Sequence, residues 1–243
     1  MYRSAITLFA ASLLLALASC REPIVRGRGT MKTEQRAITG NFTYIECELP
    51  VDADIQIVPG SNASIELTGY ENVLAHITLK MEGDKLRITT DKDVHLHSDK
   101  NLKAKIIVGS LTGLDIVGSS LAVVKGTVTG KELELNVAGS GAIEIDSVNL
   151  EKIAGEIAGS GSITIKAGTA TKGDYEIAGS GDLHAQELSH TDAEIEIAGS
   201  GLAELTAVQK LNIEIAGSGD VRYKGHPAIT KDVAGSGDIT DVN

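Results

Sequence analysis

The segment Ile157-Ala158-Gly159-Ser160-Gly161 decides the fold, because it returns at nearly constant spacing through the second half of the chain. The first glycines of successive copies are separated by 21, 20, 20, 20, 18 and 18 residues. The copies and close variants are Ile116–Ser120, Val137–Gly141, Ile157–Gly161, Ile177–Gly181, Ile197–Gly201, Ile215–Gly219 and Val233–Gly237. Self-similarity at such a period is typical of a solenoid, in which each short unit buries its apolar face against the next unit.

Apolar and polar residues alternate on both sides of each copy. Leu133, Leu135 and Val137 share one side of a strand before a copy, and Ile143 and Ile145 share one side of the strand that follows it. Later copies keep apolar residues at the matching positions. Because successive side chains of a strand point to opposite faces, these positions form inward columns when the units stack. The pattern predicts a parallel β-helix over residues 111–243, with coils of 18–21 residues.

The Ala-Gly-Ser-Gly part of each copy is interpreted as a tight corner. Stacked coils lie about 4.8 Å apart, which leaves little room for Cβ atoms at a corner. Glycine reaches positive φ without steric cost, and serine hydrogen-bonds the local backbone or its stacked neighbour. The structural turn glycines are Gly139, Gly141, Gly159, Gly161, Gly179, Gly181, Gly199, Gly201, Gly217, Gly219, Gly235 and Gly237. The alternative is a run of antiparallel hairpins, which leaves the apolar columns on both flanking strands unexplained.

Residues 34–110 are strand-like but do not repeat. Short alternating runs such as Asp54–Val58 and Ile77–Met81 end at glycine, proline or aspartate, as half-buried strands do. The turn Glu82-Gly83-Asp84 between two such runs indicates a hairpin, and Glu71–Ala75 allows a short helical turn. We expect this strand-rich part to form one continuous domain with the repeats, over residues 34–243.

The first 20 residues have the pattern of an export signal. Arg3 precedes an apolar run, Ile6–Leu17, that is short for a membrane span. The run ends in Leu17-Ala18-Ser19-Cys20, which is similar to the lipobox of bacterial lipoproteins. We therefore expect cleavage before Cys20 and a lipid anchor on Cys20, the alternative being an ordinary signal peptide. Residues 21–33, short of apolar side chains, are expected to be a flexible tether.

Composition limits the classes of partner. The formal net charge of −11 argues against nucleic acid and against an anionic bilayer surface as electrostatic partners. Apart from Cys20 the chain has one cysteine, Cys47, so no disulfide forms within the mature fold. Cys47 lies between Glu46 and Glu48, which disfavour its thiolate and argue against a reactive role.

Two sets of residues carry a resemblance to a known family. One is the repeated Val/Ile-Ala-Gly-Ser-Gly with the ending Gly225-His226-Pro227-Ala228-Ile229, and the other is the N-terminal pattern that includes Val58-Pro59-Gly60 and Gly69-Tyr70-Glu71-Asn72. Together they resemble the head GIN domain family from about Asn41 to the C-terminus. That resemblance implies a right-handed β-helix with a strand-rich N-terminal part, an adhesin-type envelope lipoprotein, and no known catalytic residues.

An acidic ladder is the main candidate site. The residue before the Ile or Val of each later copy is acidic, so that stacking places these side chains in one outward column. The column consists of Glu156, Glu176, Glu196, Glu214 and Asp232. Its functional interpretation is a face that binds Ca²⁺ weakly or holds basic partner segments, and its structural alternative is a solvated face of an acidic protein.

Two further sets of polar residues give weaker signals. Asp182, Asp220 and Asp238 directly follow their corners, and we expect them to hydrogen-bond turn amides rather than a metal ion. His95 and His97 share one face of a strand but lack a third ligand for a transition metal. We therefore predict no cofactor, with Ca²⁺ at the acidic ladder as the alternative left open.

The sequence predicts a non-enzymatic cell-envelope lipoprotein, an adhesin or scaffold anchored to a membrane through Cys20, most consistent with the outer membrane. Its ligand is a protein or a glycan, and the open ends of the solenoid allow a homo-oligomer. The alternative is a carbohydrate-active β-helix enzyme, which the scarcity of aromatic residues (3%) and of long loops disfavours. A self-assembling envelope structural protein is the third interpretation.

Overall fold

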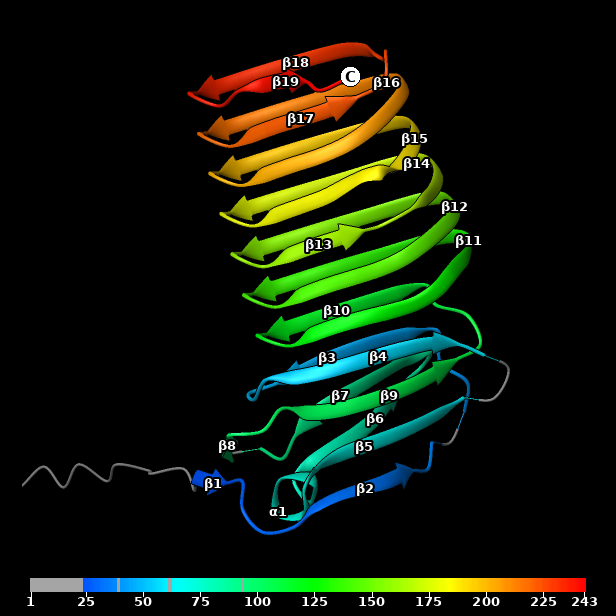
Figure 1. Cartoon of the computed structure of the whole chain (residues 1–243), viewed down its shortest axis with the longest axis vertical. Coiled ribbons are helices and arrows are strands. Elements are labelled where there is room, and N and C mark those ends of the chain that lie inside the picture. The colour runs from blue at the N-terminus through cyan, green and yellow to red at the C-terminus, as the bar shows by residue number, and fades with distance from the viewer. Residues whose placement is uncertain (1–23, 39, 61–62, 93) are drawn as a thin grey trace, which may run out of the picture.

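The chain forms an elongated β-solenoid of about six turns, with the N-terminal strands at one end and the last coil at the other (Figure 1). The computed structural model describes residues 24–38, 40–60, 63–92 and 94–243. The strands of the solenoid are β10 (Gly113–Gly118), β11 (Leu121–Gly139), β12 (Ala142–Gly159), β13 (Ser162–Ile165), β14 (Gly168–Gly179), β15 (Asp182–Gly199), β16 (Leu202–Gly217), β17 (Asp220–Lys224), β18 (Ala228–Gly235) and β19 (Ile239–Asp241).

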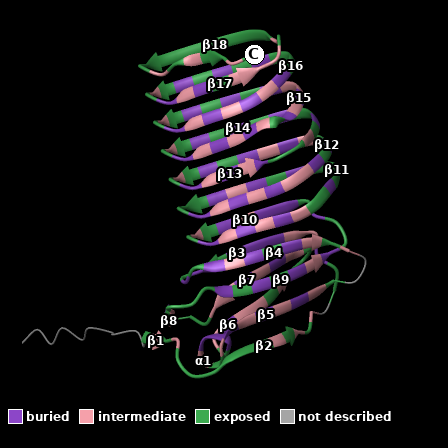
Figure 2. Ribbon diagram, viewed as in Figure 1, coloured by how far each residue is buried: buried purple, intermediate pink, exposed green. Residues whose placement is uncertain are grey.

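These strands pair only in parallel, each with the strand one coil further along. The predicted parallel β-helix is confirmed, and the antiparallel hairpin alternative is wrong. Each coil has two sides, one formed by the strand segment before its corner and one by the segment after it. Inward residues such as Leu133, Ile143 and Ile157 are buried (Figure 2), and burying each such side chain contributes about 1.5–3 kcal/mol.

The corners stack through the backbone. The N–H of each corner serine donates to the carbonyl of the first glycine in the preceding corner, from Ser140 to Gly118 (3.0 Å) through to Ser236 and Gly217 (2.8 Å). The first glycine of every corner has φ between +109° and +146°. A Cβ on Gly179 would lie 2.4 Å from the carbonyl oxygen of Gly159. The steric interpretation of these glycines is therefore confirmed, although the ladder uses the serine amide.

Each coil has a second bend, which lies at the other end of the coil from the glycine corner. Changes in coil length fall at this second bend and not at the corner. Between β15 and β16 the register shifts in the interval from Ala185 to Asp192, while Gly199 still pairs with Gly217. The step of 18 residues thus leaves the corners aligned.

The N-terminal strands continue the same stack and then close it. They are β1 (Ile24–Arg26), β2 (Met31–Arg36), β3 (Tyr44–Leu49), β4 (Ala53–Pro59), β5 (Ser64–Tyr70), β6 (Ile77–Glu82), β7 (Lys85–Thr90), β8 (His95–His97) and β9 (Leu102–Val108), with the short helix α1 (Glu71–Leu74). Strands β3 and β4 pair in parallel with β10 and β11. The pairs β2–β5, β5–β9 and β6–β7 are antiparallel, and the last of these is the expected hairpin around Gly83.

The flexible tether expected over residues 21–33 is wrong for its described part. Strand β1 pairs with β8, and β2 pairs with the edge of β5 from Met31 to Arg36. This pairing satisfies backbone groups on an edge of β5 that would otherwise be open, and β2 therefore forms although few of its residues are apolar. The signal peptide, residues 1–20, and Cys20 lie outside the described residues. Within the described ranges, no helix has both the length and the apolar character needed to cross a membrane.

One polar pair lies inside the apolar core. The hydroxyl of Tyr175 lies 2.7 Å from Nε2 of His190, and Nδ1 of His190 lies 2.9 Å from the carbonyl oxygen of Thr206. The carbonyl only accepts, so Nδ1 carries the proton and Nε2 accepts from the tyrosine. Gly155 and Gly173 occupy inward positions beside the two rings, where a Cβ would approach them to 2.9 and 2.4 Å. Burial lowers the pKa of His190, which favours its neutral form.

The last coil differs from those before it. Every residue of β18 is exposed (Figure 2). Ile229 and Val233 continue the inward columns, but Lys231 stands in register with the buried Ile213. A lysine at an inward position of a terminal strand places a charge where another strand would have to add, which is a common protection of sheet edges.

Candidate functional site

The predicted acidic ladder lies on the side of the solenoid formed by the strands before the corners. Pairing aligns its members one above the other through β12, β14, β15, β16 and β18. The stacking of these residues, which the repeat predicted, is therefore confirmed. The members are Glu156, Glu176, Glu196, Glu214 and Asp232.

The ladder carries uncompensated negative charge. In the described part of the chain, its five carboxylates form no ion pair and no side-chain hydrogen bond. Desolvation and the carboxylates of Glu214, Glu176 and Glu194 raise the pKa of Glu196. A shallow hollow of about 210 Å³ runs along Glu176, Glu196, Glu214 and Asp232. The face thus carries a continuous column of carboxylates along a shallow hollow, with Lys152, Lys172 and Lys210 in a neighbouring outward column.

In the two coils before Glu156, the positions in register with the ladder are Asn136 and Asp115. The negative charge of Asp115 is compensated there. Asp115 accepts hydrogen bonds from Tyr44 (2.5 Å), from Lys85 (3.0 Å) and from the side-chain amide of Asn136 (2.8 Å). Burial and the hydrogen bond to Asp115 raise the pKa of Tyr44, so its hydroxyl stays protonated and donates. This cluster separates the charged ladder from the N-terminal strands.

No preformed metal site accompanies the ladder. Among the described residues, no three His, Cys, Asp or Glu side chains are grouped so as to hold a metal ion. Calcium binding by the ladder therefore stays a prediction. Oδ1 of Asp220 accepts a hydrogen bond from the amide of Asp238 in the next corner (3.0 Å), which is the role expected of it. The expectation is wrong for Asp182 and Asp238, whose carboxylates accept no hydrogen bond from a turn amide in the described residues. His95 and His97 flank the buried Leu96 and share one strand face, as the alternation predicted.

Cys47 is fully buried on β3. Burial and the neighbouring Glu46 carboxylate raise the pKa of its thiol, so the thiol stays protonated. The sequence-based argument against a reactive cysteine is consistent with this environment.

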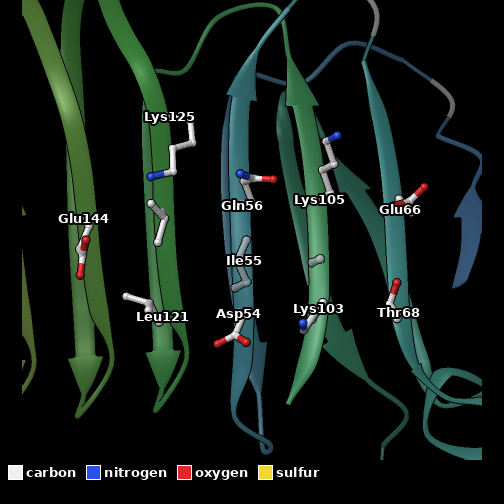
Figure 3. Close-up of a pocket in the computed structure, with 12 residues that line it drawn as sticks. Asp54, Ile55, Gln56, Glu66, Thr68, Lys103, Lys105, Leu121, Lys125 and Glu144 are labelled. Atoms are coloured by element: carbon white, nitrogen blue, oxygen red, sulfur yellow. The ribbon is translucent and has the colours of Figure 1, made fainter. Parts of the chain in front are cut away.

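A second candidate lies on the other side of the solenoid, formed by strands that follow the corners. A hollow of about 490 Å³ crosses β5, β9, β4, β11 and β12, near the junction of the N-terminal part with the repeats (Figure 3). Pairing brings Glu66 beside Lys105, Lys105 beside Gln56, Gln56 beside Val123, and Val123 beside Glu144. Such a volume lies within the range of ligand pockets.

The polar lining of this hollow comes mainly from lysines and the acids around them. Lys103 and Lys105 project from β9 and Lys125 from β11. Leu121 and Val123 form an apolar floor on β11 beside Lys125, and β4 with Asp54 and Gln56 lies between the two strands. Sequence reasoning missed this site, because its residues come from five strands that are separated along the chain. The available signal was Lys103-Ala104-Lys105, two outward lysines on one strand of an acidic protein.

Comparisons with known proteins agree with the fold. Residues 41–227 match the family model described as "Putative auto-transporter adhesin, head GIN domain". The crystal structure of a "putative adhesin" from Parabacteroides distasonis has 27% identity and a TM-score of 0.73, covering 90% of this chain and 100% of that one. A "putative adhesin" from Bacteroides fragilis has 21% identity and a TM-score of 0.82, with 90% and 100% covered, and shows the same fold.

A further solved structure from Parabacteroides distasonis is a "Putative lipid binding protein". It has 26% identity to this chain and a TM-score of 0.74, with 90% of this chain and 100% of that one covered. No protein of curated function matches the sequence.

Proposed function

Because the chain belongs to the head GIN domain family, we propose that it is a non-enzymatic binding module of the cell envelope with an adhesin-type role. The observation that carries the proposal is the register of the solenoid. Outward side chains of successive coils align over both sides of the stack, which gives long, rigid surfaces of fixed side-chain spacing. Such surfaces suit the binding of extended protein or glycan ligands.

We propose further that a lipid on Cys20 holds the module at a membrane. The residues Leu17-Ala18-Ser19-Cys20 support this proposal, and the fold adds a geometric consequence. Strand β1 begins at Ile24, so the chain between Cys20 and the fold spans at most about 14 Å. The N-terminal end of the stack would then lie at the membrane and the last coil would point away from it. An envelope membrane, the outer one above all, is the expected location.

Two experiments test these proposals separately. Metabolic labelling with an alkyne fatty acid should label the protein in cells, and Cys20→Ser should abolish the label and release the protein from the membrane fraction. Undiminished membrane association of Cys20→Ser would refute the anchor. For binding, the detergent-solubilised full chain is applied to arrays of matrix proteins and glycans. The proposal expects saturable binding to at least one class, and absence of binding throughout would count against an adhesin-type role.

A further inference from the structure

We propose that the hollow across β5, β9, β4, β11 and β12 binds an extended acidic segment of a partner polypeptide. Carboxylates of the partner would pair with Lys103 and Lys105, and its aliphatic side chains would pack on Leu121 and Val123 (Figure 3). This inference rests on the proposed binding function and names the surface and the ligand chemistry.

The first argument is the unpaired positive charge. Lys103 and Lys105 are exposed, and within the described residues neither forms an ion pair or a side-chain hydrogen bond. Among the described residues, Lys125 has one distant ion-pair partner, Asp146 at 3.7 Å. In a chain with a formal net charge of −11, three lysines around one hollow with so few partners are available to an anionic ligand.

The second argument is that the carboxylates in the same hollow are already engaged. Glu66 accepts from the side-chain amide of Gln35 (2.8 Å), and Asp54 accepts from that of Asn101 (3.1 Å). Glu144 pairs with Lys166 at 2.8 Å. The amide bonds occupy oxygens of Glu66 and Asp54 without neutralising them, and within the described residues no ion pair joins either acid to Lys103 or Lys105. The amino groups of both lysines are therefore open to a ligand carboxylate, which competes with these neighbouring acids.

The floor of the hollow gives the third argument. Leu121 and Val123 point outward, while the next coil places Ala142 and Glu144 at the corresponding positions and the coil after it Ser162 and Thr164. Half-buried apolar side chains thus lie on the outer surface of β11, beside Lys125 and two strands from Lys103 and Lys105. A ligand that crosses the strands meets the lysines of β9 and then, about 10 Å further on, the aliphatic side chains of β11. An extended peptide with acidic residues toward one end and aliphatic residues toward the other matches both features.

The shape of the hollow favours an extended ligand. It crosses five strands at a spacing of about 4.8 Å, which gives a length of about 19 Å. An extended peptide rises about 3.3 Å per residue, so about six residues fit along it. The lining has no aromatic side chain of the kind on which sugar rings stack, which favours a peptide over a glycan. An acidic polysaccharide would also match the charge of the lysines, so it is the competing ligand that the experiment must distinguish from a peptide.

The test is fluorescence anisotropy on the detergent-solubilised full chain. The probe is a labelled peptide of about six residues that carries Glu in one half and Val and Thr in the other, a length set by the hollow. Comparison probes are the same peptide with Gln for Glu, the same peptide with Lys for Glu, and an oligomer of glucuronic acid. The variants are Lys103→Gln with Lys105→Gln, and Val123→Thr, which keeps the side-chain shape. Their matched control is Lys172→Gln with Lys210→Gln, two outward lysines on the opposite side of the coils.

The proposal expects saturable binding of the acidic peptide that weakens about tenfold when Lys103 and Lys105 are replaced, since each exposed pair contributes modestly. Val123→Thr should weaken binding severalfold, and the control pair should leave it unchanged. Far-UV circular dichroism should show every variant folded. Equal binding of the Gln or Lys peptide, an equal loss in the control pair, or binding of the glucuronate oligomer alone would overturn the proposal. A ligand found on the arrays but no peptide binding would overturn this inference and leave the proposed function standing.

Discussion

Replacing Gly179 with alanine should damage the solenoid more than its small size suggests. Gly179 has φ +127°, and a Cβ placed there would lie 2.4 Å from the carbonyl oxygen of Gly159. That carbonyl accepts the 2.8 Å hydrogen bond from the amide of Ser180. The substitution therefore strains the backbone and pushes apart two stacked corners at the point where they are joined.

The expected cost has two parts. A non-glycine residue in this region of φ costs about 1–3 kcal/mol. Loss of the hydrogen bond adds about 1 kcal/mol. We expect Gly179→Ala to lower the free energy of unfolding by roughly 2–4 kcal/mol.

Gly126→Ala is the matched control. Gly126 also has positive φ (+80°), but no atom lies within 4 Å of its added Cβ, so only the backbone strain of about 1–2 kcal/mol applies. Both variants are compared with the wild type by urea unfolding followed by far-UV circular dichroism, because the chain has no tryptophan. An equal loss in the two variants would refute the argument that stacking of corners, rather than φ alone, requires glycine.

Further predictions concern the core, the acidic ladder and the last coil. Burial lowers the pKa of His190 in the folded state. The neutral imidazole therefore contributes its full stability above the unfolded-state pKa of about 6.5, and this stability falls as the pH drops below that value. Urea unfolding midpoints measured between pH 8 and pH 5 would show the loss. Tyr175→Phe leaves Nε2 of His190 without a donor and should cost about 1–3 kcal/mol at neutral pH in the same assay. Glu196→Gln removes a carboxylate whose pKa is raised, so at neutral pH and low salt it should raise the melting temperature slightly, with the gain vanishing in acid where both forms are neutral. Lys231→Ile completes an apolar column on an open edge and should promote self-association in light scattering, whereas a monomer would contradict the role given to this lysine.

The repeat was predictable because its cause is local. Glycine at a stacked corner follows from sterics, and the corners then fix the register that aligns Glu156 with Glu176 and the later acids. Residues close to a corner could therefore be placed on a side and in a column from the sequence, whereas the bend from Ala185 to Asp192 shifts the register. The alternation around Glu82-Gly83-Asp84 made the hairpin equally clear.

Other features depend on contacts that no local pattern encodes. Strand β2 is polar because it lies on an outer edge, and only its pairing with β5 distinguishes it from a linker. The Tyr175–His190 pair requires two inward glycines from neighbouring coils, Gly155 and Gly173, whose role is visible only once the coils are stacked. The lysine-lined hollow combines β9 with β11, and the sequence does not show that β4 lies between them.

The shortening of the coil between β15 and β16 has a practical consequence for protein engineering. Two residues are lost at the bend from Ala185 to Asp192, and the corner at Gly199 keeps its partner. The number of residues in a coil can thus change at the bend, whereas the glycine corner keeps its register. A foreign loop grafted at a bend would be displayed from a rigid support at a chosen height along the axis, and several grafts in successive coils would form an array with a repeat of about 4.8 Å per rung.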